Sequence, residues 1–446
     1  MNPLATLACE DLVVGSGMQG ITATRMSRDL GRRCGMVDRA KSVGGVMRPV
    51  EMAGELVDPG CQLWDARDEG NVEFLRSELN LDLVAITGFI ESSIAQDGVL
   101  RRRLPVPSFE ELPEEIRLAA AASAASHGAW PEPDASMQDS MRAIFGPDIA
   151  GRLMDIAARL YGRPVEWLAM AAVPPMGFTR IKLHGCDELE RMSEQEADMG
   201  PFVCSHPLHR KSDQIVKYFY PVGGLRAFLD RATQWLRSEL TGMVLGETPI
   251  SLEIRSNNAG GVLRTRATAI EFEQLLWCCN PLSLAKLLGH AQPPREKTAP
   301  SPFRAFFFAA RGSVVRPEYI QDYRPDSPIF RTWTPPTEMV PHRPDVQYVI
   351  VECPGTNTDV EMVGEITERI RTLHALADAD IRFLGTQSQV RFYPTAVYVR
   401  WLHEFVTLLR SQGAAVLLPE EPLYGRGTIA DWWHNTLRQR VGEVAR

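Results

Sequence analysis

The sequence lacks the basic excess and the long apolar runs that nucleic-acid-binding and membrane-spanning proteins need. Its 446 residues contain 48 Lys and Arg against 56 Asp and Glu, a formal net charge of −8. Such a chain cannot hold nucleic acid by neutralising phosphates, and no polybasic segment favours an anionic membrane surface. The longest strongly apolar stretch, residues 305–310, is far shorter than the about 20 residues that span a bilayer. We therefore expect neither nucleic acid nor a membrane among its partners.

Cysteine is also scarce, and its spacing fits no zinc-ligand pattern. Eight cysteines in a chain of this length predict neither a disulfide framework nor a metal site. The first residues have neither the basic start nor the long apolar region of a secretory signal, so we expect a cytoplasmic protein. With 44% hydrophobic and 23% charged residues, the composition is that of an ordinary globular enzyme, and the length suffices for two or three domains.

The first forty residues predict a βαβ unit with a glycine-rich turn. A short apolar strand at 11–14 runs into the sequence G-S-G-M-Q-G at 15–20, which opens a helix to about residue 29. A second strand at 34–37 ends at Asp38, eighteen residues after Gly20. A strand, a glycine turn, a helix and then an acid form the context in which G-x-G-x-x-G binds a dinucleotide.

Each residue of this motif has an expected role. Gly15 permits the tight turn, Gly17 lets the backbone approach a pyrophosphate, and Gly20 lets the helix pack close to the strand. The helix N-terminus directs unpaired N–H groups and a partial positive charge at the phosphates. Asp38 is expected to accept hydrogen bonds from the ribose hydroxyls.

Further motifs distinguish FAD from NAD as the dinucleotide. Gly44 and Gly45 follow Asp38 by six and seven residues, and Arg48 comes just after them. Ordered landmarks continue to the end of the chain: L-V-D-P-G at 56–60, F-G-P-D-I-A at 145–150, L-Y-G-R-P at 160–164, Y-P-V-G-G-L at 220–225, a strand-like segment at 319–331, Y-P at 393–394 and L-Y-G-R at 423–426. In this order they resemble the FAD-dependent amine oxidase/protoporphyrinogen oxidase superfamily, with the greatest likeness to its UDP-galactopyranose mutase-like branch.

The resemblance implies an α/β fold in which a Rossmann-type FAD-binding domain is interleaved with a second, mixed β-sheet substrate domain and a helical insertion. We expect the FAD-binding domain at 1–80, 215–255 and 385–446, the mostly helical insertion at 80–215 and the β-rich domain at 255–385. The resemblance also places Gly425 and Arg426 against the flavin side of FAD. A helix from about residue 429 would point its positive end at the flavin ring.

At the positions that would carry chemistry, the chain departs from the family's pattern. Arg304 falls where the family's strand carries a lysine, and an arginine cannot replace that lysine as a base. Residues 61–64 hold no histidine where the mutases have one. Trp64 is either a ring beside the flavin or a core aromatic, and Arg331 is a candidate for phosphate contacts. These three residues are the catalytic candidates, and no base is assigned.

Three functions remain open at this point. The leading prediction is an FAD-dependent oxidoreductase that acts on a small organic substrate, such as a nucleotide sugar or a biosynthetic intermediate. The first alternative is a flavin-dependent sugar-nucleotide mutase that works with reduced flavin and no net redox change. The second is an FAD-binding partner protein that has lost catalysis. The sequence predicts no oligomeric state.

Overall fold

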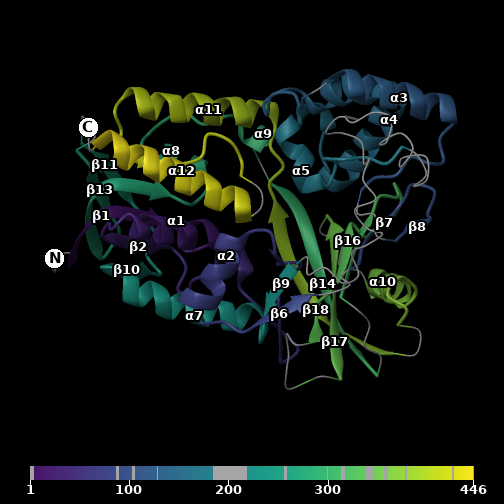
Figure 1. The fold of residues 1–446 in the computed structure, drawn as a ribbon, viewed down its shortest axis with the longest axis horizontal. Helices are drawn as coiled ribbons and strands as arrows, with labels where there is room; N and C mark the ends of the chain where they lie inside the picture. The colour runs from purple at the N-terminus through teal and green to yellow at the C-terminus, as the bar shows by residue number, and fades with distance from the viewer. Residues whose placement is uncertain are drawn as a thin grey trace.

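The computed structural model describes residues 5–86, 90–102, 106–127, 129–183, 218–255, 259–298, 300–312, 317–337, 343, 345–355, 360–376, 379–423 and 426–444. Within these ranges the chain forms two large β-sheets, a helical layer and a small linking sheet (Figure 1). No helix in the described ranges is long and apolar enough to cross a membrane.

The first sheet begins with the predicted βαβ unit. In spatial order it contains β10 (Gly242–Leu245), β2 (Cys34–Asp38), β1 (Ala5–Val14), β13 (Thr268–Trp277), β12 (Gly261–Arg264) and β11 (Ser251–Ile254), with β19 (Val416–Leu417) beside β13. The central strands are parallel and covered on both faces. In β1, Val13 packs under helices α1, α7 and α12, whereas Leu12 and Val14 pack under α8 and α11. This explains the unbroken apolar run at the end of β1.

The helices over the two faces of the first sheet come from distant parts of the chain. They are α1 (Met18–Asp29), α7 (Gly224–Glu239) and α12 (Arg426–Val444) on one face, and α8 (Pro281–Leu287) and α11 (Ala396–Ser411) on the other. Figure 1 shows α12, near the C-terminus, lying beside α1. The chain therefore returns to its first helix at its end, as the resemblance predicts.

The second sheet is mixed and has two unlike faces. Its order is β18 (Asp380–Arg391), β14 (Ser301–Arg311), β17 (Val346–Pro354), β16 (Arg331–Thr334), β15 (Glu318–Asp322), β7 (Ile90–Ile94) and β8 (Leu100–Arg101). Phe306 and Phe308 of β14 point to α10 (Val360–Leu373). Ala305 and Phe307 point to the opposite face, which meets the hairpin of β3 (Val50–Met52) and β4 (Glu55–Val57).

A small sheet lies between the two large ones. It consists of β5 (Trp64–Asp65), β9 (Tyr218–Pro221) and β6 (Leu83–Ile86). The short helix α2 (Glu69–Glu73) follows β5, and α9 (Arg295–Thr298) precedes β14. Through these pieces the backbone crosses between the two sheets several times, so the interleaved α/β architecture is confirmed.

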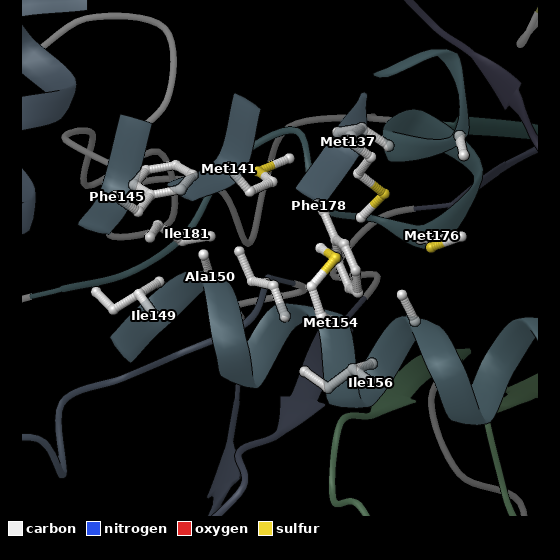
Figure 2. Packing of buried hydrophobic residues seen from close by; sticks show 14 of the residues in the cluster. Met137, Met141, Phe145, Ile149, Ala150, Met154, Ile156, Met176, Phe178 and Ile181 are labelled. Carbon is white, nitrogen blue, oxygen red and sulfur yellow. The ribbon is translucent and has the colours of Figure 1, made fainter. Parts of the chain in front are cut away.

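The helical layer consists of α3 (Glu114–His127), α4 (Met137–Tyr161) and α5 (Val173–Met176). Its core is rich in methionine: Met137, Met141 and Met176 are fully buried beside Phe178 (Figure 2). Helix α4 kinks at Gly146, whose φ of 79° is non-helical and which precedes Pro147. The kink wraps the helix around this core.

Several strands belong to a different sheet from the one that the expected domain boundaries imply. Strands β12 and β13 continue the first sheet beyond residue 255, because the buried residues Leu275, Leu276 and Trp277 align β13 in parallel with β1. Residues 83–86, 90–94 and 100–101, expected in the helical insertion, form β6, β7 and β8 of the two other sheets. The end of β18, residues 385–391, pairs with β14 in the second sheet. These memberships follow from the pairing of strands that lie far apart in the chain, which a local propensity pattern does not reveal.

Candidate cofactor and substrate site

The glycine turn after β1 is packed too closely for side chains. Gly15 has a φ of 106°, and a Cβ atom there would lie 2.6 Å from Cys279 Sγ. A Cβ atom on Gly20 would lie 1.8 Å from the carbonyl oxygen of Gly15. The first turn of α1 therefore rests directly on the backbone that leads out of β1, as the motif predicts.

A second glycine turn faces the start of α1. A Cβ atom on Gly45 would lie 3.2 Å from Gly17 Cα, and Gly44 donates its N–H to the carbonyl of Ser16. Gly17 caps α1 without a side-chain hydrogen bond, and the first turn holds no acidic residue. Bare N–H groups and the positive end of the helix dipole thus lie at a cradle formed by backbone alone, the arrangement that receives phosphate.

Asp38 and Arg48 hold the two turns in place. The Asp38 carboxylate accepts hydrogen bonds from the backbone N–H and the hydroxyl of Ser16, each at 2.6 Å, and from Ala40 N–H at 2.8 Å. Arg48 Nε donates to the carbonyl of Val43 at 3.2 Å. Both residues predicted for the cofactor therefore lie at the cradle, where Asp38 also orders the glycine turn.

The cradle leads into a cavity of about 1080 Å³ between the first and second sheets. Met18 of α1 and Ile429 of α12 line one side, and Tyr319 of β15 and Arg331 of β16 line the other. This volume exceeds the ~300–1,000 Å³ of ordinary small-molecule pockets.

The wall from the second sheet carries a network of polar side chains. Arg331 and Arg391 both donate to the carboxylate of the buried Glu352. Arg331 Nη1 also donates to the Tyr319 hydroxyl at 3.2 Å. Burial raises the pKa of Glu352, but the two guanidinium groups outweigh burial and bring the pKa below its ordinary value. The ions are therefore kept charged by one another.

Behind the cavity, Asp58 joins the small sheet to helix α7. Its Oδ2 accepts hydrogen bonds from the Tyr220 hydroxyl at 2.5 Å and from Leu225 N–H, in the first turn of α7, at 2.9 Å. The side chain is buried, and this burial raises the pKa of Asp58 from 3.8 to about 6. The L-V-D-P-G and Y-P-V-G-G-L landmarks therefore meet in one hydrogen-bonded unit.

The raised pKa predicts a pH-dependent contribution of Asp58 to stability. The folded protein binds this proton more tightly than the unfolded chain, so the stabilisation is complete below about pH 4 and is lost as the pH rises through about 6. Relative to Asp58→Asn, the native chain should lose about 3 kcal/mol of unfolding free energy across this range. Urea unfolding of both proteins between pH 4 and pH 8 measures the difference. Parallel pH profiles would contradict the assignment.

A second variant tests which contacts set the raised pKa of Asp58. Tyr220 donates a hydrogen bond that lowers the pKa of Asp58. In Tyr220→Phe the midpoint of the pH-dependent loss should therefore move to higher pH. A midpoint that stays in place would mean that the hydroxyl does not act on this carboxyl.

Several solved structures share the fold of this chain over nearly its whole length. A protein assigned as a protoporphyrinogen oxidase from Exiguobacterium sp. 255-15 superposes with a TM-score of 0.65 at 13% identity, covering 99% of this chain and 100% of the other. Reduced UDP-galactopyranose mutase gives 0.64 at 12% identity, covering 97% and 96%. A double mutant of putrescine oxidase gives 0.61 at 13% identity, covering 98% and 100%. This chain has the amine oxidase-like fold. No protein-family model and no curated protein sequence matches it.

Within the amine oxidase-like fold, two of the three catalytic candidates lie away from the cavity. Arg304 donates to Thr386 Oγ1 at 3.2 Å and shares its side of β14 with Phe306, on the face that α10 covers. Trp64 is 1% exposed and packs on Phe228, with ring centroids 5.1 Å apart. Arg304 therefore does not take a position beside the cavity, and Trp64 is a core aromatic. Arg331 is the candidate that lines the cavity.

The C-terminal part of the predicted site is described only in part. Gly425 lies outside the described residues, and Arg426 is the first residue of α12, without a described side chain. The helix itself approaches the cavity, since Ile429 and Asp431 line it. Among the described residues, no group of three or more His, Cys, Asp or Glu side chains could hold a metal ion.

Sequence reasoning missed Glu352, Arg391 and Gln321 as members of the site. They come from β17, β18 and β15, and only strand pairing brings them together. One sequence feature could have indicated this network. Glu352 is a lone acid at the end of an apolar strand, and a charge in such a position needs a buried partner.

Proposed function

We propose that the chain binds FAD, with the pyrophosphate at the cradle formed by Gly15, Gly17, Gly44 and Gly45. The observation that carries this proposal is the close approach of the two glycine turns at the uncapped N-terminus of α1. The residues fit the group, because the cradle has bare N–H groups where phosphate oxygens need donors. Asp38 would hold the ribose, and Gly425 and Arg426 would approach the flavin side.

We infer further that the protein is an oxidoreductase acting on a small organic substrate. The flavin supplies the redox chemistry when it is bound, while this chain binds and orients the substrate. The substrate would occupy the part of the cavity lined by Tyr319 and Arg331. The fold shared with an oxidase for putrescine, a small organic molecule, supports this proposal. We place the enzyme in the cytoplasm, as the sequence suggests.

A sugar-nucleotide mutase is the second candidate, supported by the shared fold with UDP-galactopyranose mutase. The charge of the cavity disfavours it. Among the described residues that line the cavity, five are carboxylates and two are guanidiniums: Asp65, Asp68, Glu69, Glu91 and Asp431, against Arg67 and Arg331. A nucleoside diphosphate would bring at least two more negative charges into this cavity, where the carboxylates would repel them. We therefore rank the oxidoreductase first and the FAD-binding partner without catalysis last.

Anaerobic mixing with candidate substrates separates these functions. The FAD-loaded protein is mixed with small amines, small carboxylic acids and UDP-galactopyranose, and the flavin absorbance is followed. An oxidoreductase should lose the oxidised-flavin bands with one of the small compounds and without added reductant. Conversion of the sugar nucleotide only after dithionite reduction would favour the mutase. No response to any compound would favour the partner protein.

A further inference from the structure

The cavity wall formed by β15 and β16 presents a hydroxyl proton that no described residue accepts. The Tyr319 oxygen accepts hydrogen bonds from Gln321 Nε2 at 3.0 Å and from Arg331 Nη1 at 3.2 Å. Within the described ranges no acceptor receives the proton of this hydroxyl. Because burial raises the pKa of Tyr319, the proton stays in place at neutral pH. Since Tyr319 lines the cavity, the hydroxyl is a donor available to a bound molecule.

A buried neighbour fixes the direction of these hydrogen bonds. The Tyr323 hydroxyl donates to Gln321 Oε1, which leaves the amide nitrogen of Gln321 to donate to Tyr319. Tyr323 is 1% exposed, so water does not compete for its hydroxyl. The chain of donors therefore runs toward Tyr319, and both lone pairs of the Tyr319 oxygen are used.

Arg331 adds a second donor beside Tyr319. Its Nε binds Glu352 and its Nη1 binds Tyr319, whereas its Nη2 has no acceptor in the part of the chain that the structure describes. The side chain keeps 24% of its surface exposed, on the cavity side. Glu352 is shared with Arg391, so one carboxylate balances two guanidiniums. These three ions together carry one net positive charge.

We infer that this wall binds a carboxylate group of the substrate, with Tyr319 O–H and Arg331 Nη2–H as the two donors. Two adjacent donors, one of them charged, match the two oxygens of a carboxylate. A single negative charge balances the one excess positive charge of the three ions. A phosphate ester carries close to two negative charges and would meet stronger repulsion from the five carboxylates that line the cavity, of which Glu91 lies on β7 opposite Tyr319. The inference rests on the proposed function only in placing the substrate in this cavity.

Matched aromatic probes test the inference on the FAD-loaded protein. Benzoate and benzamide have the same shape but differ in charge, and phenyl phosphate supplies the alternative oxyanion. Isothermal titration should show benzoate binding at least about 10-fold more tightly than benzamide, and more tightly than phenyl phosphate. Arg331→Gln and Tyr319→Phe should each reduce the preference for benzoate over benzamide several-fold or more. Tyr218→Phe removes a hydroxyl from the same cavity, one that donates to Glu91, and should leave the preference unchanged.

Three results of the binding experiment would overturn parts of this inference or of the proposed function. Equal binding of benzoate and benzamide, or an undiminished preference in Tyr319→Phe with native-like circular dichroism and thermal unfolding, would overturn the inference. Tighter binding of phenyl phosphate would overturn the choice of carboxylate over phosphate. Flavin content is scored separately by absorbance, so a protein that takes up no FAD but still prefers benzoate would refute the proposed function and leave the carboxylate site standing.

Discussion

Replacing Gly17 by aspartate should abolish FAD binding and leave the fold intact. The residue has ordinary extended dihedral angles, φ −74° and ψ −173°, and a Cβ atom there meets only Gly45 Cα, at 3.9 Å. Aspartate is a favoured helix cap, so its carboxylate would take the N–H groups that we assign to the pyrophosphate. It would also oppose the phosphates with a like charge, which at about 4 Å costs about 4 kcal/mol at an effective dielectric constant of 20. We expect the affinity for FAD to fall at least about 100-fold, with unchanged or higher thermal stability of the apoprotein.

Gly17→Asn is the matched control for this substitution. Asparagine has the same shape and caps the helix about as well, but it carries no charge. Its loss of FAD affinity should therefore be about 10-fold smaller than that of Gly17→Asp. Fluorescence titration of the two apoproteins with FAD measures both constants. Native-like affinity in Gly17→Asp, with α1 intact by circular dichroism, would show that the phosphates do not lie at this cradle.

Replacing Gly20 by alanine should destabilise the protein by several kcal/mol. The added methyl group would lie 1.8 Å from the Gly15 carbonyl oxygen and 3.3 Å from a methyl carbon of Val13. The first of these neighbours is backbone and cannot rotate away, so α1 would have to separate from β1. Thermal and urea unfolding should show the loss, and FAD binding should weaken with it.

Gly364 supplies the matched control for the alanine substitution. It also lies within a helix, α10, but a Cβ atom there meets no atom within 4 Å. Alanine in an exposed helix interior is favoured over glycine by about 1 kcal/mol, so Gly364→Ala should stabilise the protein slightly. Equal stability of the Gly20 and Gly364 variants would contradict the close packing of α1 on the glycine turn.

The glycine cradle could be predicted from the sequence because it is local. Gly15, Gly17, Gly20 and Asp38 lie within one βαβ unit, in which Gly15 and Gly20 have no room for a Cβ atom and Asp38 accepts the Ser16 N–H. Such contacts depend on spacing alone.

The direction in which Arg304 points could not be predicted from the sequence. A strand alternates its side chains between two faces, and an alignment error of one residue moves a side chain to the wrong face. In β14 the apolar residues are continuous from Ala305 to Ala310, so no alternation marks the cavity side. The burial of Phe306 and Phe308 against α10 decides it.

The network of polar side chains on the second sheet could not be predicted from the sequence for another reason. Arg331, Glu352 and Arg391 come from three strands and meet through the order of the sheet. The pairing of strands depends on the whole core, so a sequence motif cannot reveal it. Arg331 was a candidate from the resemblance, but its partners were found only in the structure.

FAD binding can be tested by the absorbance spectrum of the purified protein, recorded before and after addition of FAD and then of dithionite. The native protein should show oxidised-flavin bands that remain with it on gel filtration and bleach on reduction. Gly17→Asp, prepared in the same way, should show none. A folded native chain that carries no flavin even after incubation with excess FAD would show that the glycine cradle does not bind FAD.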